Sequence, residues 1–177
     1  MTEPETLCNG RWLRLKRRGR WEYAERTNPG GAVMIIAVTP DDRILFVEQP
    51  RPAVERRTIE MPAGLVGDSA ARADEGILET ANRELVEETG YRAGSLRLLI
   101  DGPPSAGMSS EVMGFVLARE LVRVGSGGGD ATESITVHEI PRGEALGWLL
   151  ERHRTGHSVD PKVFAGLYML DNAAFFA

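Results

Sequence analysis

The sequence predicts an α+β fold in which helices cover both faces of a mixed β-sheet, an α/β/α sandwich. Residues Ala32–Val38 form a continuous apolar run with the length of a buried central strand. A segment from about Asp74 to Gly90 has helical periodicity, and two more helical segments follow, over Pro141–Arg154 and from Asp160 to about Leu170. The 177 residues fit one domain that buries roughly two-thirds of its unfolded surface.

Residues Arg11–Thr27 predict a β-hairpin with a turn near Gly19. Basic and apolar residues are interleaved in the first half, and Trp21 begins a second extended run. The basic side chains fit an arm that meets phosphate or a partner subunit, and they equally fit an edge hairpin that its charges keep soluble. A turn follows at residues 28–31, so we expect residues 1–29 to form an N-terminal hairpin ahead of a main domain over residues 30–177.

The stretch after the central strand carries candidate phosphate contacts. Asp41-Asp42 predicts a turn, and Ile44–Val47 predicts a strand able to pair back on the first one. Arg51 follows this strand, and a guanidinium can clamp phosphate oxygens bidentately or form a surface ion pair, for example with Glu55. Gly64, in the loop before the helix, allows the backbone to approach a neighbouring group closely.

The predicted helix carries three carboxylates along the edge of its apolar face. The apolar positions on one arc are Ile77, Leu78, Ala81 and Leu85, and the carboxylates beside them are Glu84, Glu87 and Glu88. Carboxylates three and four residues apart repel each other, and a divalent cation reverses the sign of that interaction. The same pattern also fits an acidic, solvated helix face, so the spacing alone leaves both interpretations open.

Two strands, a glycine-rich loop and the last helices are predicted after Gly90. Ser95–Ile100 and Glu111–Ala118 read as strands, and Gly125–Gly129 is typical of a flexible lid or substrate loop. The three histidines, His138, His153 and His157, show no metal-ligand spacing with Cys or acidic residues, which favours surface or packing roles.

The segment from Glu75 to Tyr91 resembles the signature of the Nudix hydrolases, G-x5-E-x7-R-E-U-x-E-E-x-G-U, where U is aliphatic or bulky. The matching positions are Glu75, Arg83, Glu84, Leu85, Glu87, Glu88, Gly90 and Tyr91. Only the opening departs from the pattern, because Ser69 stands where the first glycine belongs. Gly64 suits that role with ten intervening residues instead of five, which indicates a five-residue insertion in the loop.

This resemblance implies the Nudix α/β/α sandwich and a cation site. Glu84, Glu87 and Glu88, together with a main-chain carbonyl of Ala63 or Gly64, would hold Mg²⁺ or Mn²⁺. Three further motif residues, Glu75, Arg83 and Gly90, would have structural roles and hold the loop on the helix.

The resemblance also implies the residues that perform the reaction. Besides Glu87, an acidic residue in the loop before the last sheet strand would act as general base, and Glu133 fits best, with Glu111 and Asp130 as rivals. The steps Gln-x-Arg at 49–51 and Glu-x-Pro-Ala-Gly at 60–64 are similar to the ADP-ribose and nucleotide-sugar branch. The expected substrate-binding residues are Arg51, Glu60, Glu111, Arg20 and Trp21, of which Trp21 can stack on a base or simply pack.

The implied reaction is metal-dependent hydrolysis of the diphosphate bond of a nucleoside diphosphate sugar, first of all ADP-ribose, to a nucleoside monophosphate and a sugar phosphate. Two alternatives stay open. The chain is a Nudix enzyme for dinucleotides or oxidised nucleoside triphosphates, or it is a Nudix-fold nucleotide-binding module without hydrolysis. The three carboxylates argue for catalysis, and the altered loop length is the only support for the binding module.

Charge and composition limit the kinds of partner that the chain can have. The net charge of −5 argues against a general binder of nucleic acid or anionic membranes. The single cysteine, Cys8, excludes an intramolecular disulfide, and no apolar run reaches the ~18 residues of a membrane span. Residues 1–6 have no signal-peptide character, so a cytoplasmic protein is expected. The resemblance further implies a homodimer that exchanges N-terminal strands through the hairpin.

Overall fold

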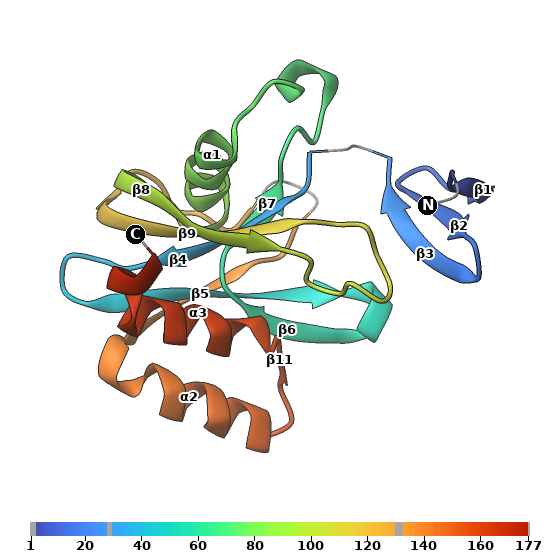
Figure 1. Ribbon diagram of the computed structural model, residues 1–177. Helices are drawn as coiled ribbons and strands as arrows, with labels where there is room; N and C mark the ends of the chain where they lie inside the picture. The colour runs from blue at the N-terminus through green and yellow to red at the C-terminus, as the bar shows by residue number, and fades with distance from the viewer. Residues whose placement is uncertain (1–2, 28–29, 130–132, 177) are drawn as a thin grey trace.

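A computed structural model describes residues 3–27, 30–129 and 133–176 of the chain. In these ranges two four-stranded sheets lie in the body of the molecule with helices on both sides, and a separate three-stranded sheet lies at the N-terminal end (Figure 1). The predicted α+β sandwich is therefore confirmed.

The N-terminal sheet contains β1 (Glu5–Asn9), β2 (Leu13–Arg18) and β3 (Trp21–Arg26) in that order. The predicted hairpin is present, with Gly19 at a positive φ of 60° in its turn. The structure adds strand β1 to the predicted hairpin. This strand was not predicted, because the polar segment before Gly10 has no sequence pattern typical of a strand. The Ala24 amide donates to the Met108 carbonyl at 2.8 Å, which ties β3 to a loop of the body.

The first sheet of the body has the order β7-β4-β9-β8. Its strands are β4 (Ala32–Ala37), β7 (Ala63–Leu65), β8 (Tyr91–Gly102) and β9 (Met113–Arg123). Strand β4 runs parallel to β9 and antiparallel to β7, so the sheet is mixed as expected. Every residue of β4 is buried, with Val33 and Ile35 on the face of α1 (Ile77–Thr89) and Met34 and Ile36 on the opposite face.

The second sheet has the order β10-β5-β6-β11. Its strands are β5 (Arg43–Arg51), β6 (Arg56–Glu60), β10 (Thr136–Pro141) and β11 (Ser158–Val159), with the short 3-10 helix η1 (Pro52–Val54) between β5 and β6. The expected pairing of Ile44–Val47 with the first strand was wrong. A lone bridge joins Val38 to Ile44, because β6 and β10 occupy the two edges of β5.

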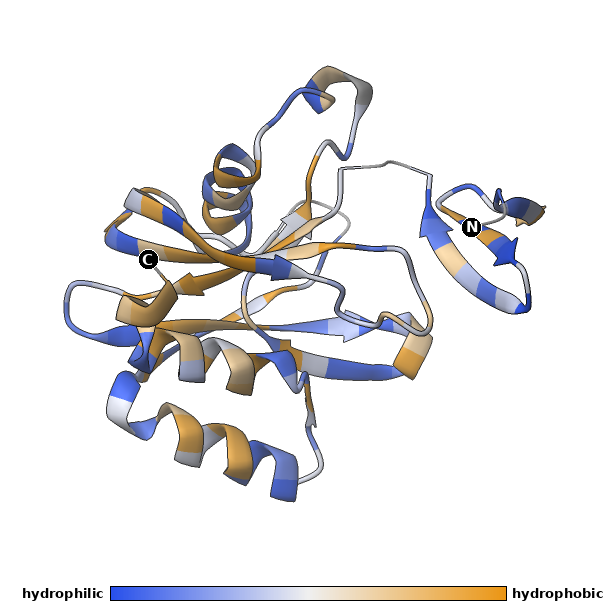
Figure 2. Ribbon diagram, viewed as in Figure 1, coloured by the Kyte–Doolittle hydropathy of each residue, from blue (hydrophilic) through white to orange (hydrophobic). Residues whose placement is uncertain are grey.

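Helices α2 (Arg142–Arg154) and α3 (Lys162–Asp171), followed by the 3-10 helix η3 (Ala173–Phe176), cover the face opposite α1. Hydrophobic residues concentrate on the central strands (Figure 2), and Ala145, Leu149 and Val163 of these helices pack into the core. In the described part of the chain, no helix is long and apolar enough to cross a membrane.

Helix α1 begins three residues later than the periodicity predicts, after a loop that contains the 3-10 helix η2 (Ala70–Arg72). The Glu79 side chain accepts a hydrogen bond from the Gly76 amide at 3.0 Å and so fixes the first turn. Leu78 is 37% exposed, so its assignment to the buried stripe was wrong, whereas Ala81 and Leu85 are fully buried. The helix ends at Gly90, whose φ of 77° suits glycine.

Candidate active site

Two of the three helix carboxylates face the sheet. Glu84 and Glu88 are one turn apart on α1, so their side chains lie on the same side of the helix. Glu88 is 3% exposed, and the Glu84 side chain is also largely buried. Burial of two ionisable groups at this spacing is costly unless their charge is compensated.

The short strand β7 forms the wall opposite these carboxylates. The Ala63 amide donates a hydrogen bond to Oε2 of Glu88 at 3.1 Å. A Cβ placed on Gly64 would lie 2.1 Å from Oε1 of Glu84, so the carboxyl group packs directly against the glycine backbone. Residue 64 must therefore lack a side chain if Glu84 is to keep this position, a requirement that agrees with its predicted place in the motif.

Burial raises the pKa of both carboxyl groups. The pKa of Glu84 rises to about 7, mainly through desolvation, with the Arg83 guanidinium opposing the shift and the Glu87 charge adding to it. The pKa of Glu88 rises to about 8, again mainly through desolvation, while the hydrogen bond from Ala63 opposes the shift. Both groups would be ionised more readily beside a cation.

A cavity of about 360 Å³ opens beside these carboxylates. It gathers seven of the eleven residues that the sequence predicts for catalysis, cation binding or substrate binding. Among those residues, the ones that line it are Arg51, Ala63, Gly64, Glu84, Glu88, Glu111 and Glu133. Contributions from β5, β7, α1 and the loop before β10 thus converge on one polar pocket, although they are separated in sequence.

Arg51 enters the cavity from the end of β5 and is held by Glu60. Its Nε and Nη2 atoms donate to the two carboxylate oxygens of Glu60 at 2.8 and 2.5 Å. This bidentate pair takes the place of the alternative ion pair with Glu55. In the strand register Arg51 lies opposite Arg56, so its side chain reaches along β6 to Glu60. Glu60 is 6% exposed and does not line the cavity, so it acts on the pocket through Arg51.

The glycine loop is anchored on α1. The amides of Gly128 and Gly129 donate to the carbonyls of Glu88 and Glu87 at 2.8 and 3.0 Å, which satisfies acceptors at the end of the helix. The expectation that Gly125–Gly129 is a flexible lid or substrate loop stays a prediction, with the loop attached to the helix at Gly128 and Gly129. Glu133, which follows this loop in the sequence, lines the cavity.

Glu111 and Asp130, the two alternatives to Glu133 as general base, differ in what the structure shows of them. Glu111 lines the cavity but forms a short ion pair with Arg26 of β3. Asp130 lies outside the described residues. Among the residues of this loop that the structure describes, Glu133 is the acid that borders the cavity. Its negative charge contributes to the raised pKa of Glu88.

Glu87 does not line the cavity. Its Oε2 accepts a hydrogen bond from Nη1 of Arg83 at 3.1 Å, and its side chain is 42% exposed. Arg83 also bonds Glu75 at 3.0 Å and Glu84 at 2.9 Å, so this arginine joins the loop to the helix in the way expected of the motif. A role for Glu87 at the cation requires its side chain to leave Arg83.

Asp68 is a cavity residue that the sequence reasoning missed. It lies in the inserted part of the loop, where no spacing rule applied. The five-residue insertion could have indicated it, because an insertion next to the matched motif places new side chains beside the same carboxylates. Its Oδ2 lies 3.2 Å from Nη1 of Arg72.

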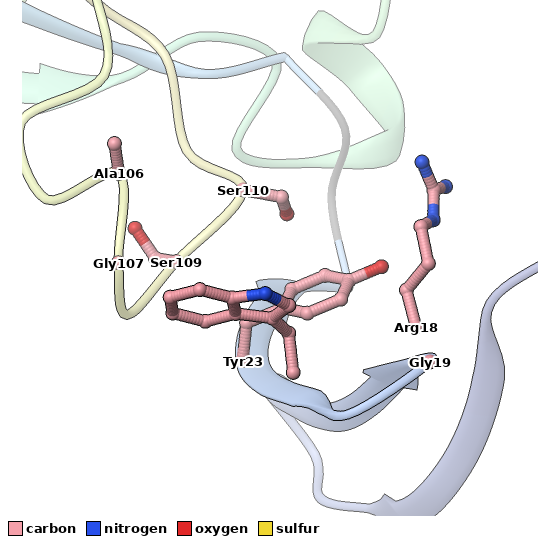
Figure 3. A pocket seen from close by; sticks show the side chains of 8 residues that line it. Arg18, Gly19, Tyr23, Ala106, Gly107, Ser109 and Ser110 are labelled. Carbon is pink, nitrogen blue, oxygen red and sulfur yellow. The ribbon is translucent and has the colours of Figure 1, made fainter. Parts of the chain in front are cut away.

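Trp21 does not border the carboxylate cavity, and neither does Arg20. Trp21 lines a second cavity of about 520 Å³ together with Arg18, Tyr23 and the loop residues Ser109 and Ser110 (Figure 3). This cavity lies between the N-terminal hairpin and the loop before β9. Arg20 sits beside the hairpin turn, is exposed and lines neither cavity.

The carboxylate cavity suits a hard divalent cation. The carboxylates of Glu84 and Glu88 line it and supply the oxygen ligands that such a cation takes, and Glu84 packs against the backbone of Gly64. Within residues 3–27, 30–129 and 133–176, no three His, Cys, Asp or Glu side chains form a ready-made cage. Two carboxylates with substrate phosphate completing the shell is the arrangement that Mg²⁺ commonly adopts.

Comparisons with known proteins agree with this geometry. A family model described as the NUDIX domain matches residues 28–146. The methanol dehydrogenase activator of Bacillus methanolicus is 31% identical over 155 residues, covering 84% of this chain and 81% of that protein. The ADP-ribose pyrophosphatase of Bacillus subtilis (strain 168) is 37% identical over 103 residues, 58% of this chain and 53% of that protein. A crystal structure of an ADP compounds hydrolase shares the fold, with a TM-score of 0.70, 22% identity, and coverage of 96% of this chain and 90% of that one.

Proposed function

The chain belongs to the Nudix hydrolase family, and on this premise we propose that it hydrolyses the diphosphate bond of nucleoside diphosphate sugars, with ADP-ribose as the first substrate. The products would be a nucleoside monophosphate and a sugar phosphate. The observation that carries the proposal is the cavity in which the carboxylates of α1 face Arg51 and Glu133.

The cation in this proposal is Mg²⁺, with Mn²⁺ as a substitute. Glu84, Glu88 and a main-chain oxygen of Ala63 or Gly64 would hold it, and Glu87 would join them after leaving Arg83. When bound, the cation stabilises negative charge on the phosphate oxygens and lowers the pKa of a coordinated water. The protein residues bind and orient the substrate around this position.

Arg51 and Glu133 have separate tasks. The planar guanidinium of Arg51 is oriented by Glu60 and presents its remaining N–H groups to a phosphate or to the terminal ribose. Glu133, which also lines the cavity, would take the proton from the attacking water. Glu111 is the rival base, but its pairing with Arg26 favours a role in positioning the substrate.

The substrate class follows from the cavities next to the carboxylates. Arg26 and Glu111 border both the carboxylate cavity and a neighbouring cavity of about 530 Å³. Ser110 borders that neighbour and the cavity of Trp21 and Tyr23. A substrate with a diphosphate in the first cavity can therefore extend toward aromatic side chains able to stack on a base, as a nucleoside diphosphate sugar would.

A binding module without hydrolysis is the second candidate. The orientation of Glu87 toward Arg83 and the inserted loop favour it, and similarity to a protein named as an activator is compatible with it. Both candidates bind nucleotide, so turnover separates them. Dinucleotides and oxidised nucleoside triphosphates are alternative substrates within the enzyme class.

The test is hydrolysis of ADP-ribose, GDP-mannose, a dinucleoside diphosphate and an oxidised nucleoside triphosphate, with Mg²⁺ and with EDTA. The variant Glu84→Gln should lose metal-dependent turnover. Glu79→Gln on the same helix should retain it, because an amide oxygen can still accept the Gly76 hydrogen bond. Tight nucleotide binding without turnover on any member would support the binding module instead.

We further propose a cytoplasmic homodimer in which residues 1–29 serve as the dimerisation arm and residues 30–177 as the hydrolase domain. Trp12, Leu13 and Leu15 of the arm are 64%, 49% and 41% exposed, which leaves apolar surface for a second copy. Sedimentation velocity of the full chain and of Leu15→Glu tests this, since the substitution should yield monomer.

A further inference from the structure

The inserted loop places one more carboxylate at the cation cavity. Strand β7 ends at Leu65, and Gly67 turns the chain with a φ of 65°, after which Asp68 lines the cavity. In Figure 1 this loop projects beyond the N-terminal end of α1 and returns to it. The loop therefore does more than connect two elements, because it contributes a charged group to the pocket wall.

Asp68 also belongs to a closed ring of alternating charges. It lies 3.2 Å from Arg72, and Arg72 lies 3.8 Å from Glu87. Glu87 lies 3.1 Å from Arg83, and Arg83 lies 3.8 Å from Asp68. The ring thus joins the inserted loop to the helix that carries the cation carboxylates.

The members of this ring differ in their relation to the cavity. Asp68 borders the cavity directly, whereas Arg72 does not. Arg72 therefore acts on the site only through the two carboxylates that it neutralises, Asp68 and Glu87. Neutral substitutions of Asp68 and of Arg72 should then change the charge at the cavity in opposite directions.

Resting on the proposed cation site, we propose that Asp68 is a positioning residue for the divalent cation and that Arg72 restrains it. Asp68 adds negative charge to the cavity wall beside Glu84 and Glu88. It orients the cation by this charge and is not itself one of the residues proposed to ligate it. Arg72 lowers that charge by pairing with Asp68 and Glu87. The inserted loop thereby sets the affinity of the site for the cation.

Mn²⁺ affinity of the full chain, measured by electron paramagnetic resonance without substrate, tests this inference. Asp68→Asn should weaken Mn²⁺ binding about tenfold, the lower range for loss of a group that supports metal ligands. Arg72→Gln should tighten it about threefold, within the range of an exposed ion pair. Asp74→Asn, an exposed acid of the same loop, is the matched control and should bind like wild type.

The opposite signs distinguish the proposal from a purely structural role. If Asp68 only tied the loop to Arg72, both substitutions would loosen the loop and weaken Mn²⁺ binding together, which would overturn the inference. Equal binding by wild type and Asp68→Asn would also overturn it and leave the proposed function intact. Equal weak binding by wild type and Glu88→Gln would instead remove the cation site itself, and with it both proposals.

Discussion

Substitution of Gly64 by alanine is expected to displace Glu84 from the cation site while leaving the fold in place. The new Cβ would stand 2.1 Å from both Cδ and Oε1 of Glu84, whereas ordinary contact begins at 3.4 Å. The carboxyl group must therefore retreat by about 1.3 Å, the difference between these distances. A misplacement of about 1 Å at a reacting centre can cost about 100-fold in rate.

The stability cost should be small, because the obstructing atoms, Cγ, Cδ and Oε1 of Glu84, belong to a side chain and not to the backbone. We expect the free energy of unfolding to change by no more than about 1 kcal/mol, a typical value for single substitutions. The matched control is Gly102→Ala, at the end of β8, where an added Cβ meets nothing within 4 Å.

Two measurements decide the outcome for Gly64→Ala. The first is Mn²⁺ affinity by electron paramagnetic resonance, expected to fall by about 10- to 100-fold. The second is kcat/KM for ADP-ribose with saturating Mg²⁺, expected to fall about 100-fold. The reasoning is refuted if Gly64→Ala melts like wild type and keeps both values within about threefold.

Three other predictions concern the same cavity. Because burial raises the pKa of Glu84 to about 7 and of Glu88 to about 8, Mn²⁺ affinity should rise between pH 6 and 8, by up to about tenfold per pH unit for each proton released, as isothermal titration in buffers of different ionisation enthalpy can check. Without a cation, the free energy of unfolding should fall as the pH rises from the ordinary carboxyl pKa of 4.5 to about 8, as melting curves can check. Arg51→Lys, which loses the bidentate fork to Glu60, should raise KM for ADP-ribose about tenfold with little change in kcat, and an unchanged KM would contradict the assignment. Glu133→Gln should lower kcat by about 10²- to 10⁴-fold with Mn²⁺ affinity retained, and a normal kcat would move the role of base elsewhere.

The elements with strong periodicity were predictable from the sequence. Strand β4 is apolar at every position because both of its faces are covered, and α1 has an apolar arc that packs on that strand. The pairing of β5 was not predictable, since an apolar strand carries no signal that says which edge it will join. Strand β1 was missed because its residues are all exposed and show no alternation.

The candidate site was predictable only as far as its residues follow a fixed spacing. Glu84 and Glu88 reach the cavity because residues four apart share a helix face. The orientation of Glu87 depends on Arg83, four residues earlier on the same helix, and the sequence gives no rule for choosing between an ion pair and a cation. The partner of Arg51 was likewise not predictable, because the contact with Glu60 runs diagonally between strands in which Arg51 lies opposite Arg56.

The charge balance around α1 unites these observations. Five carboxylates, those of Asp68, Glu75, Glu84, Glu87 and Glu88, lie within the network or cavity next to only two arginines of the loop and helix, Arg72 and Arg83. Arg72 and Arg83 pair with Asp68, Glu75, Glu84 and Glu87, and Glu84 shares Arg83 with Glu75 and Glu87. The two most buried members lack full compensation, so burial raises their pKa, and a divalent cation would stabilise their ionised form.

This distribution would let a cation bind at the proposed site while the loop stays attached to the helix. Arg83 holds Glu75 with two of its nitrogen atoms and needs only Nη1 for Glu84 and Glu87. A cation that takes these two carboxylates therefore frees one nitrogen and leaves the loop attached through the others. Loss of Arg83 should consequently affect folding more than cation binding, whereas loss of Glu84 should have the reverse effect.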